Sequence, residues 1–309
     1  MLVRQRPLRY FLGCIMAAMA VMAQVPPVAA QVAAQQTYAR TPDGVKIAIQ
    51  EWGTPSGPEV VLIHGLLGSH LSWTRQLQDP ALHRFRIITY DLRGHGLSGA
   101  PIDPKAYQSG KLWADELKTV IEAKHLKRPV IVGWSMGGLV LTNYMLAYGD
   151  RSVGGVVFVD GVMELKPEYI VPKPEIDHLL TSSDLHEYSD GVAAFTKRCF
   201  FQQPNPRDLE RFITIGGMAS PVMTSAVSHG ITDAAARPLK TTVPALIIYG
   251  NHDEHLRRAM AIREKAVLPQ ARLSYYSDSG HSPFFESWLR FDRELASFVD
   301  QNEQSMTHE

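Results

Sequence analysis

A serine flanked by glycines is the first feature of the sequence that could do chemistry. Ser135 lies in Gly133-Trp134-Ser135-Met136-Gly137, directly after the apolar run 130–133 and directly before a helix-like run. Gly-x-Ser-x-Gly alone is a weak signal, but this strand–turn–helix setting is the one that a serine nucleophile requires. A Cβ at the flanking glycines would clash in so tight a turn. The serine is therefore expected above the sheet edge, where the helix N-terminus favours negative charge.

A serine nucleophile needs a base and an acid, and the later part of the chain offers both. His281 lies in Gly-His-Ser-Pro after the last apolar strand, and Asp253 lies in Gly-Asn-His-Asp after the strand before it. The order Ser135, Asp253, His281 is the serine–acid–histidine order of one known arrangement. Asp160, at the end of VVFVDG, is an alternative acid because it also follows a strand.

The early stretch HGLLG (64–68) ends another apolar strand and supplies the remaining group that acyl transfer needs. A backbone N–H there, that of Leu66, is expected to pair with the N–H of Met136 and form an oxyanion hole. His64 is expected to brace this loop rather than react. The residues Asp91, Arg93 and His95 are expected to fix the next loop by hydrogen bonds.

Apolar strands that alternate with helical patterns predict the scaffold that positions these residues. A hairpin is expected around Asp43-Gly44, and further strands at 61–64, 86–91, 130–133, 153–161, 245–250 and 272–280. Helical patterns cover 111–126, 136–148, about 256–267 and 284–299. This rhythm predicts an α/β fold with a mostly parallel sheet flanked by helices. It breaks between about Met163 and Lys240, which reads as an inserted helical segment rather than a separate domain.

The motifs together resemble the α/β-hydrolase superfamily over about residues 37–300. HGLLGS (64–69), DLRGHGLS (91–98), GWSMGG (133–138), GNHD (250–253) and GHSPFFE (280–286) follow that superfamily's order and spacing. The resemblance implies Ser135 as nucleophile, His281 as base, Asp253 as acid, and Leu66 and Met136 as oxyanion donors. It also implies that the insertion is a cap over the site. The branch that looks most similar contains small esterases and cofactor-free haloperoxidase-like enzymes.

The first thirty residues differ from the rest of the chain. A head with Arg4, Arg6 and Arg9 precedes a short apolar run and a small-residue end, which is typical of a secretory signal peptide. The run is short for a membrane span. The predicted organisation is therefore a signal peptide at 1–30, a core at 31–162, a cap at 163–240 and the rest of the core at 241–309. The mature protein is expected to be exported, in the periplasm or secreted, without stable membrane insertion.

Composition narrows the possible partners. The chain has 309 residues, with 31 Lys+Arg balanced by 31 Asp+Glu, and no basic block, so no nucleic-acid partner is expected. No Cys/His cluster has zinc spacing, and no metal or cofactor is expected. His252 and His255 flank Asp253 and are interpreted as polar loop surface. Cys199 is expected to be a buried side chain that packs in the apolar interior. The sequence does not indicate the oligomeric state.

These patterns predict a serine hydrolase that cleaves a small to medium carboxylic ester or a lactone through an acyl-enzyme on Ser135. Other chemistry with the same three residues stays open, namely carbon–carbon hydrolysis, acyl transfer, aminopeptidase, perhydrolase or hydroxynitrile lyase activity. A catalytically silent ligand-binding protein is the alternative from a different class. The cap is expected to place Phe195, Phe200, Phe201, Phe212, Ile213 and Met218 over the pocket or against the core.

Overall fold

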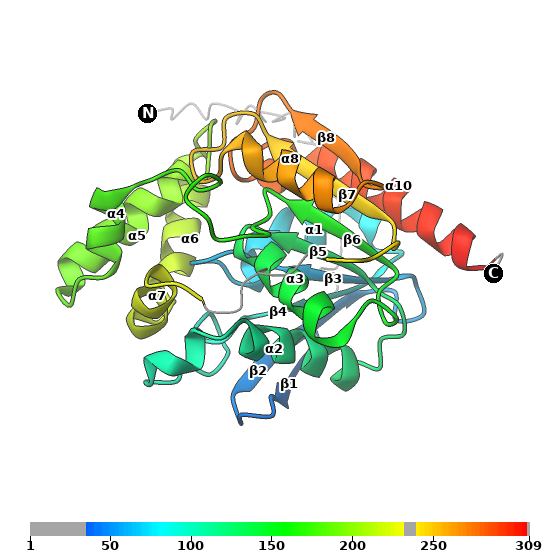
Figure 1. The fold of residues 1–309 in the computed structure, drawn as a ribbon, viewed down its shortest axis with the longest axis horizontal. Coiled ribbons are helices and arrows are strands. Elements are labelled where there is room, and N and C mark those ends of the chain that lie inside the picture. The colour runs from blue at the N-terminus through cyan, green and yellow to red at the C-terminus, as the bar shows by residue number, and fades with distance from the viewer. Residues whose placement is uncertain (1–34, 232–238, 308–309) are drawn as a thin grey trace, which may run out of the picture. The chain divides into compact units, whose positions relative to one another are not determined.

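A twisted sheet with the strand order β1-β2-β4-β3-β5-β6-β7-β8 forms the centre of the computed structural model (Figure 1). The structure describes residues 35–231 and 239–307. The strands are β1 (Gln35–Arg40), β2 (Lys46–Gly53), β3 (Glu59–Ile63), β4 (Arg86–Tyr90), β5 (Val130–Trp134), β6 (Gly155–Val159), β7 (Ala245–Gly250) and β8 (Arg272–Tyr276). β2 pairs antiparallel with β1 and β4, and every other pairing is parallel. The predicted fold class is confirmed.

Helices cover both faces of this sheet. They are α1 (Thr74–Gln78), α2 (Gly110–Ala123), α3 (Met136–Tyr148), α4 (Pro174–Leu180), α5 (Leu185–Arg198), α6 (Pro206–Gly217), α7 (Pro221–Ser228), α8 (Arg258–Val267), α9 (Pro283–Glu286) and α10 (Trp288–Thr307). α2 and α3 pack together on one face, and α1 contacts α10 on the other (Figure 1). Burial on both faces is why β5 and β7 are apolar without alternation.

The sequence pattern predicted most of these elements, with errors at the ends and in short helices. α3 and β7 have the predicted bounds, and the hairpin at Asp43-Gly44 joins β1 to β2. The single helix predicted at 284–299 is wrong in detail: the chain forms α9, breaks at Ser287 and continues as α10 to Thr307. α1 and the short 3₁₀ turns at 70–73, 80–82 and 104–107 lack a periodic apolar face and were not predicted.

Between β6 and β7 the chain leaves the sheet and forms α4, α5, α6 and α7, the group on the left of Figure 1. α4 packs on α5, and α5 packs on α6. This is the interval where the strand–helix rhythm stops in the sequence. Part of it, residues 232–238, lies outside the described residues, as does the predicted signal peptide at 1–30. No helix in the described ranges is long and apolar enough to cross a membrane.

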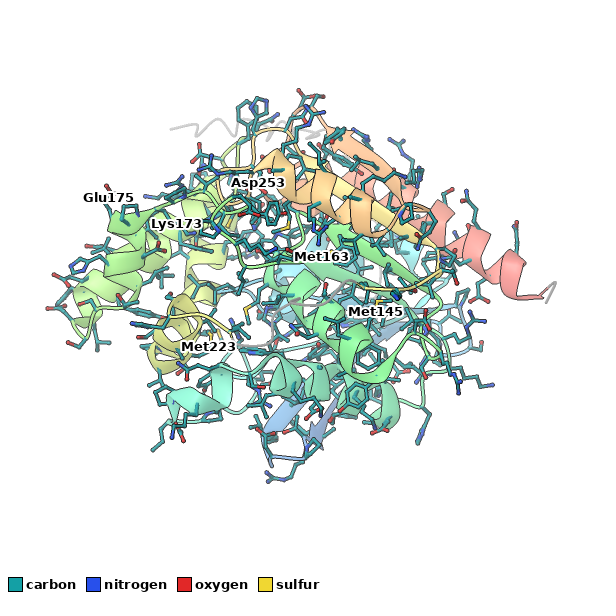
Figure 2. The ribbon with its side chains drawn as sticks, in the orientation of Figure 1. Met145, Met163, Lys173, Glu175, Met223 and Asp253 are labelled. Atoms are coloured by element: carbon teal, nitrogen blue, oxygen red, sulfur yellow. The ribbon has the colours of Figure 1, made fainter. Side chains whose placement is uncertain are left out.

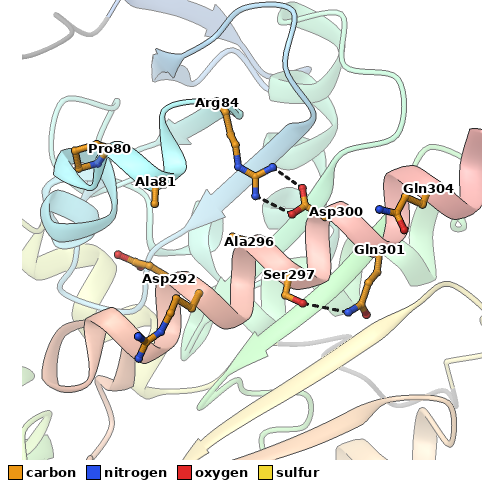
Figure 3. A pocket seen from close by; sticks show the side chains of 10 residues that line it. Pro80, Ala81, Arg84, Asp292, Ala296, Ser297, Asp300, Gln301 and Gln304 are labelled. Atoms are coloured by element: carbon orange, nitrogen blue, oxygen red, sulfur yellow. Dashed lines mark hydrogen bonds and ion pairs between the residues drawn. The ribbon is translucent and has the colours of Figure 1, made fainter.

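A surface hollow of about 710 Å³ lies between the 80–84 turn and α10 (Figure 3). Arg84 and Asp300 form a paired hydrogen bond across it, at 2.5 and 2.8 Å. Asp292 also lines the hollow, but its side chain is buried and accepts a hydrogen bond from Gln76 Nε2 at 2.8 Å. Burial, reinforced by the negative charge of Asp79, raises the pKa of Asp292 to about 7.

We expect Asp292→Asn to stabilise the protein at alkaline pH. A carboxyl whose pKa is raised in the folded state favours folding in its protonated form, so its contribution to stability is full below about pH 4 and is lost as pH rises towards 7. Asparagine stays neutral, so the gain over wild type should be near zero at pH 4 and reach roughly 2–4 kcal/mol above pH 7. Denaturant unfolding across this pH range measures it.

Asp300→Asn is the matched control, because Asp300 lies on the same helix but forms an ion pair at the surface. It should change the free energy of unfolding by less than about 1 kcal/mol at every pH. A gain for Asp292→Asn that does not depend on pH would contradict the expectation.

Candidate active site

Ser135 occupies the turn between β5 and α3 in a strained backbone conformation. Its φ of 53° and ψ of −118° lie in a region that residues with a side chain rarely adopt. A Cβ on Gly133 would lie 2.6 Å from the Gly137 carbonyl group, and a Cβ on Gly137 would lie 2.5 Å from the Ile63 oxygen. The two motif glycines therefore serve close backbone approach, as expected from the sequence.

Hydrogen bonds to the neighbouring strand hold this strained turn in place. The Ser135 amide donates to the Val159 carbonyl at 3.1 Å, and the Ser135 carbonyl accepts from Val162 at 2.8 Å. Strain of this kind persists only when the surroundings impose it. The backbone of β6 and of the residues that follow it supplies that constraint.

His281 and Asp253 come together at the carboxyl ends of β7 and β8. His281 Nδ1 lies 2.7 Å from Asp253 Oδ2, and both side chains are almost fully buried. Asp253 Oδ1 accepts from the amides of His255 and Leu256 at 2.7 and 2.9 Å, which fixes the carboxylate. Since a carboxylate only accepts, Nδ1 of His281 carries the proton and Nε2 is left with a lone pair.

Two observations describe how the His281 ring is held. Trp134 Nε1, from the residue before Ser135, donates to the His281 carbonyl at 2.7 Å, so the strand that carries the serine also anchors the histidine loop. His281 Nε2 is buried and has no hydrogen-bond partner among the described residues. A buried nitrogen lone pair without a partner is a base that is free to accept a proton.

Asp160 lies close to this pair, but no hydrogen bond joins it to His281 among the described residues. Its Oδ1 accepts from the Gly250 amide at 2.9 Å, and it approaches within 4.8 Å of ligand atoms of Asp253 and His281. Burial, reinforced by the negative charge of Asp253, raises the pKa of Asp160 well above its usual range. A carboxyl whose neutral form is favoured is poorly suited to stabilise a histidine cation. Asp160 Oδ2 and His281 Nε2 have no partner among the described residues, whereas both oxygens of Asp253 are hydrogen-bonded.

The loop after β3 brings Leu66 next to the serine. A Cβ on Gly65 would lie 2.9 Å from the Ser135 Cβ, so this loop passes directly over the turn that carries Ser135. Within the described part of the chain, the amides of Leu66 and Met136 have no protein acceptor. Both residues line the same pocket as Ser135. Two free amides beside a serine can bind a negatively charged oxygen.

Two buried histidines brace this loop. His64 Nδ1 donates to the Gly65 carbonyl at 2.8 Å, and His64 Nε2 accepts from the Leu92 amide at 3.0 Å. His95 Nδ1 donates to the Arg93 carbonyl at 3.0 Å, and His95 Nε2 accepts from the Leu67 amide at 3.3 Å. Each ring donates once and accepts once, so each is neutral. Burial lowers the pKa of His64 to about 4 and that of His95 to about 3.

The next loop is fixed as predicted by Asp91, Arg93 and His95. Asp91 accepts from the His70 amide at 2.7 Å and from the Leu97 amide at 2.9 Å. Arg93 is fully buried between Glu116 and Asp43 and binds both. These contacts have structural roles, since none of the three residues lines the pocket at Ser135.

A pocket of about 550 Å³ opens beside Ser135, with walls from both the core and the segment between β6 and β7. The core contributes Leu66, Met136 and Leu139, and the inserted segment contributes mostly apolar side chains that include Leu180 and Phe195. A cavity of this size, lined by apolar side chains together with several polar ones, suits a small organic molecule.

The six residues expected above the pocket behave differently from one another. Phe195 lines the pocket. Phe200 and Phe212 pack edge-on against Phe285 at 5.5 and 5.0 Å between ring centroids, which holds the inserted segment on the core. Phe201 is about half exposed and stacks on His252 at 3.6 Å.

Of the remaining two, Met218 is about half exposed and Ile213 is partly buried; neither lines the pocket. For five of the six, then, the structure shows contact with the core, partial burial or exposure rather than a place in the pocket wall. A helix that packs on a core and a helix that roofs a cavity share one amphipathic pattern, so the sequence could not separate the two.

Two residues line the pocket although the sequence did not predict them there. His255 was read as polar loop surface, and this is wrong: it is 4% exposed and lines the pocket, with its ring 4.8 Å from His281 and 4.3 Å from Phe195. The amide bonds to Asp253 turn the loop inward at this point, and the sequence carries no sign of that. Lys173, which also lines the pocket, was missed because nothing in its sequence context distinguishes it from a surface lysine.

The chain belongs to the alpha/beta hydrolase fold family, whose model matches residues 58–287. Its structure is similar to the crystal structure of a proposed aryl esterase from Burkholderia cenocepacia, with 44% identity and a TM-score of 0.85 over 87% of this chain and 100% of that one. It is also similar to an esterase from Exiguobacterium antarcticum, with 25% identity and a TM-score of 0.76 over 85% and 99% of the two chains. A bifunctional esterase/perhydrolase from Acinetobacter calcoaceticus is 28% identical over 85% of this chain and 99% of that one.

Proposed function

We propose that the protein is a serine hydrolase that cleaves small to medium carboxylic esters or lactones through an acyl-enzyme on Ser135. The observation that carries this proposal is the setting of Ser135: a strained turn with two free amides at its edge and a pocket in front of it. The His281–Asp253 pair supports it, because it supplies a buried base with a free nitrogen, on a loop that is hydrogen-bonded to the residue before Ser135. The similar esterases support ester bonds as the target.

In the proposed reaction, His281 Nε2 takes the Ser135 proton as Oγ attacks the ester carbonyl. The carbonyl oxygen becomes negatively charged and is bound by the Leu66 and Met136 amides, while the N-terminus of α3 adds a favourable field. The imidazolium is stabilised by Asp253 and then protonates the leaving alcohol. Water, activated by the same histidine, attacks the acyl-enzyme and releases the acid and the free serine.

The segment 163–240 is proposed to act as a cap in this reaction. Its described residues contribute a large part of the pocket wall, and the aromatic contacts to Phe285 hold it on the core. A wall of this kind excludes water from the bound acyl group and selects its size. The proposed cap therefore determines which esters reach Ser135.

A fluorophosphonate probe, together with a hydrolysis screen, tests the proposal. The wild-type chain should be labelled at Ser135 and should hydrolyse p-nitrophenyl esters or lactones faster than matched anilides. Labelling absent at Ser135 would favour a silent binding protein. Labelling without turnover of any ester or lactone would favour another reaction of the same three residues.

A further inference from the structure

Lys173 is a cationic side chain that lines the pocket and that the proposed reaction leaves unused. It directly precedes α4, where Figure 2 labels it. It lines the pocket together with Ser135. Its ammonium group lies 5.7 Å above the centroid of the Phe195 ring, and its side chain is partly buried. Among the described residues it forms no ion pair, although most partly buried cations in proteins have a paired anion.

The acidic groups around Lys173 do not neutralise it. Asp253 is committed to His281 and to two backbone amides. Asp177 also lines the pocket but forms no ion pair with the lysine. Burial lowers the pKa of Lys173, and the charge of Arg198 adds to this, whereas the charges of Asp177 and Asp253 only partly oppose it. The pocket thus contains a lysine without an ion-pair partner among the described residues, in the same cavity as Ser135.

We propose that Lys173 binds a carboxylate of the substrate, at the end of a short apolar spacer from the ester that Ser135 attacks. This inference rests on the proposed function and narrows its substrate class. The apolar walls at Leu139, Val162 and Phe195 would contact the spacer, and the ammonium group would supply the anion with a charge-assisted hydrogen bond. A half-ester of a dicarboxylic acid, or a lactone that carries a carboxylate, meets these requirements.

Matched esters test the charge alone. Monoethyl adipate carries a carboxylate where ethyl hexanoate carries a methyl group, and 5-acetoxypentanoate places the carboxylate on the alcohol side. We expect the wild-type protein to have a higher kcat/KM for one of the two anionic esters than for ethyl hexanoate. Lys173→Met should lower kcat/KM for that ester by roughly ten- to a hundredfold, the loss expected for one hydrogen bond to a charged group. Ethyl hexanoate should change by less than about threefold.

Two further variants keep the test independent of folding. Lys173→Glu should reverse the preference towards ethyl 6-aminohexanoate, whose ammonium group replaces the carboxylate. Lys197→Met is the matched control, because it removes the same charge from an exposed position on α5 that does not line the pocket. It should leave the order of kcat/KM among the four esters unchanged.

The failure of this inference differs from the failure of the proposed function. Equal effects of Lys173→Met on charged and neutral esters, or no effect on either, would overturn the role of Lys173 while ester hydrolysis stands. If no ester is turned over, calorimetry on the Ser135→Ala chain decides. Lys173-dependent binding of monoethyl adipate would support the anion site by itself, and binding of ethyl hexanoate as tight as that of monoethyl adipate would refute it.

Discussion

Ser135→Ala should abolish fluorophosphonate labelling and lower kcat for ester hydrolysis by about 10⁵–10⁶-fold, the loss seen when a nucleophile of this type is removed. The variant loses the atom that forms the acyl-enzyme but keeps the two oxyanion amides and the pocket. Some acceleration over water, on the order of 10³-fold, should therefore remain. Labelling and single-turnover kinetics on the purified variant measure both quantities.

Ser228→Ala is the matched control for this variant, because Ser228 lines the same pocket from α7 and its hydroxyl donates to the Thr224 carbonyl. It should keep kcat within a few-fold of wild type. Circular dichroism should show that both variants are folded. Labelling of Ser135→Ala at the wild-type rate would remove Ser135 from the mechanism.

Asp253→Asn should lower kcat by about 10⁴-fold, because an amide cannot stabilise the histidine cation and can hold the wrong tautomer. Asp160→Asn should cost less than about tenfold. Burial and the charge of Asp253 raise the pKa of the Asp160 carboxyl well above its usual range, which favours its neutral form, and asparagine can still accept from the Gly250 amide. Steady-state kinetics of the two variants at pH 7 to 8 measure the contrast.

The comparison discriminates between the two acids that the sequence left open. A large loss for Asp160→Asn with a small loss for Asp253→Asn would make Asp160 the functional acid, in spite of the 2.7 Å contact between Asp253 and His281. Equal large losses of kcat would indicate that the two carboxyls act as one unit. In that case the loss in the double variant would be smaller than the two single losses combined.

The elements that carry the proposed site were predictable because each depends on local sequence. The glycines around Ser135 and the apolar runs of β5 and β7 leave little choice of backbone, and strand ends of a parallel sheet meet at one edge. The close approach of Gly65 to Ser135 follows the same logic. What the sequence could not supply is the direction of side chains in loops, since a loop has no periodicity to reveal its buried side.

His255 and Lys173 illustrate this limit. His255 is buried because its own amide bonds to Asp253, and Lys173 reaches the pocket because of where α4 begins. The burial of His255 also depends on its contacts with Phe195 and His281, which lie far from it in the chain. The inserted segment was recognisable from its length and broken rhythm, but its pocket-lining residues were not, because several amphipathic helices can pack on one another in more than one way.

His64 and His95, the two neutral histidines that brace the Leu66 loop, affect two properties of the protein. One is its stability at low pH, and the other is the proposed binding of a negatively charged intermediate by the Leu66 amide. Each has a pKa depressed by burial, so each costs stability as pH falls from 6.5 towards its folded pKa, at about 1.4 kcal/mol per pH unit. Once protonated, His64 and His95 can no longer accept from the amides of Leu92 and Leu67. Acidification should therefore release this loop before global unfolding, seen as faster hydrogen exchange at these two amides together with slower labelling of Ser135. The environments in which such a chain can work would then be limited by two side chains that never touch its substrate.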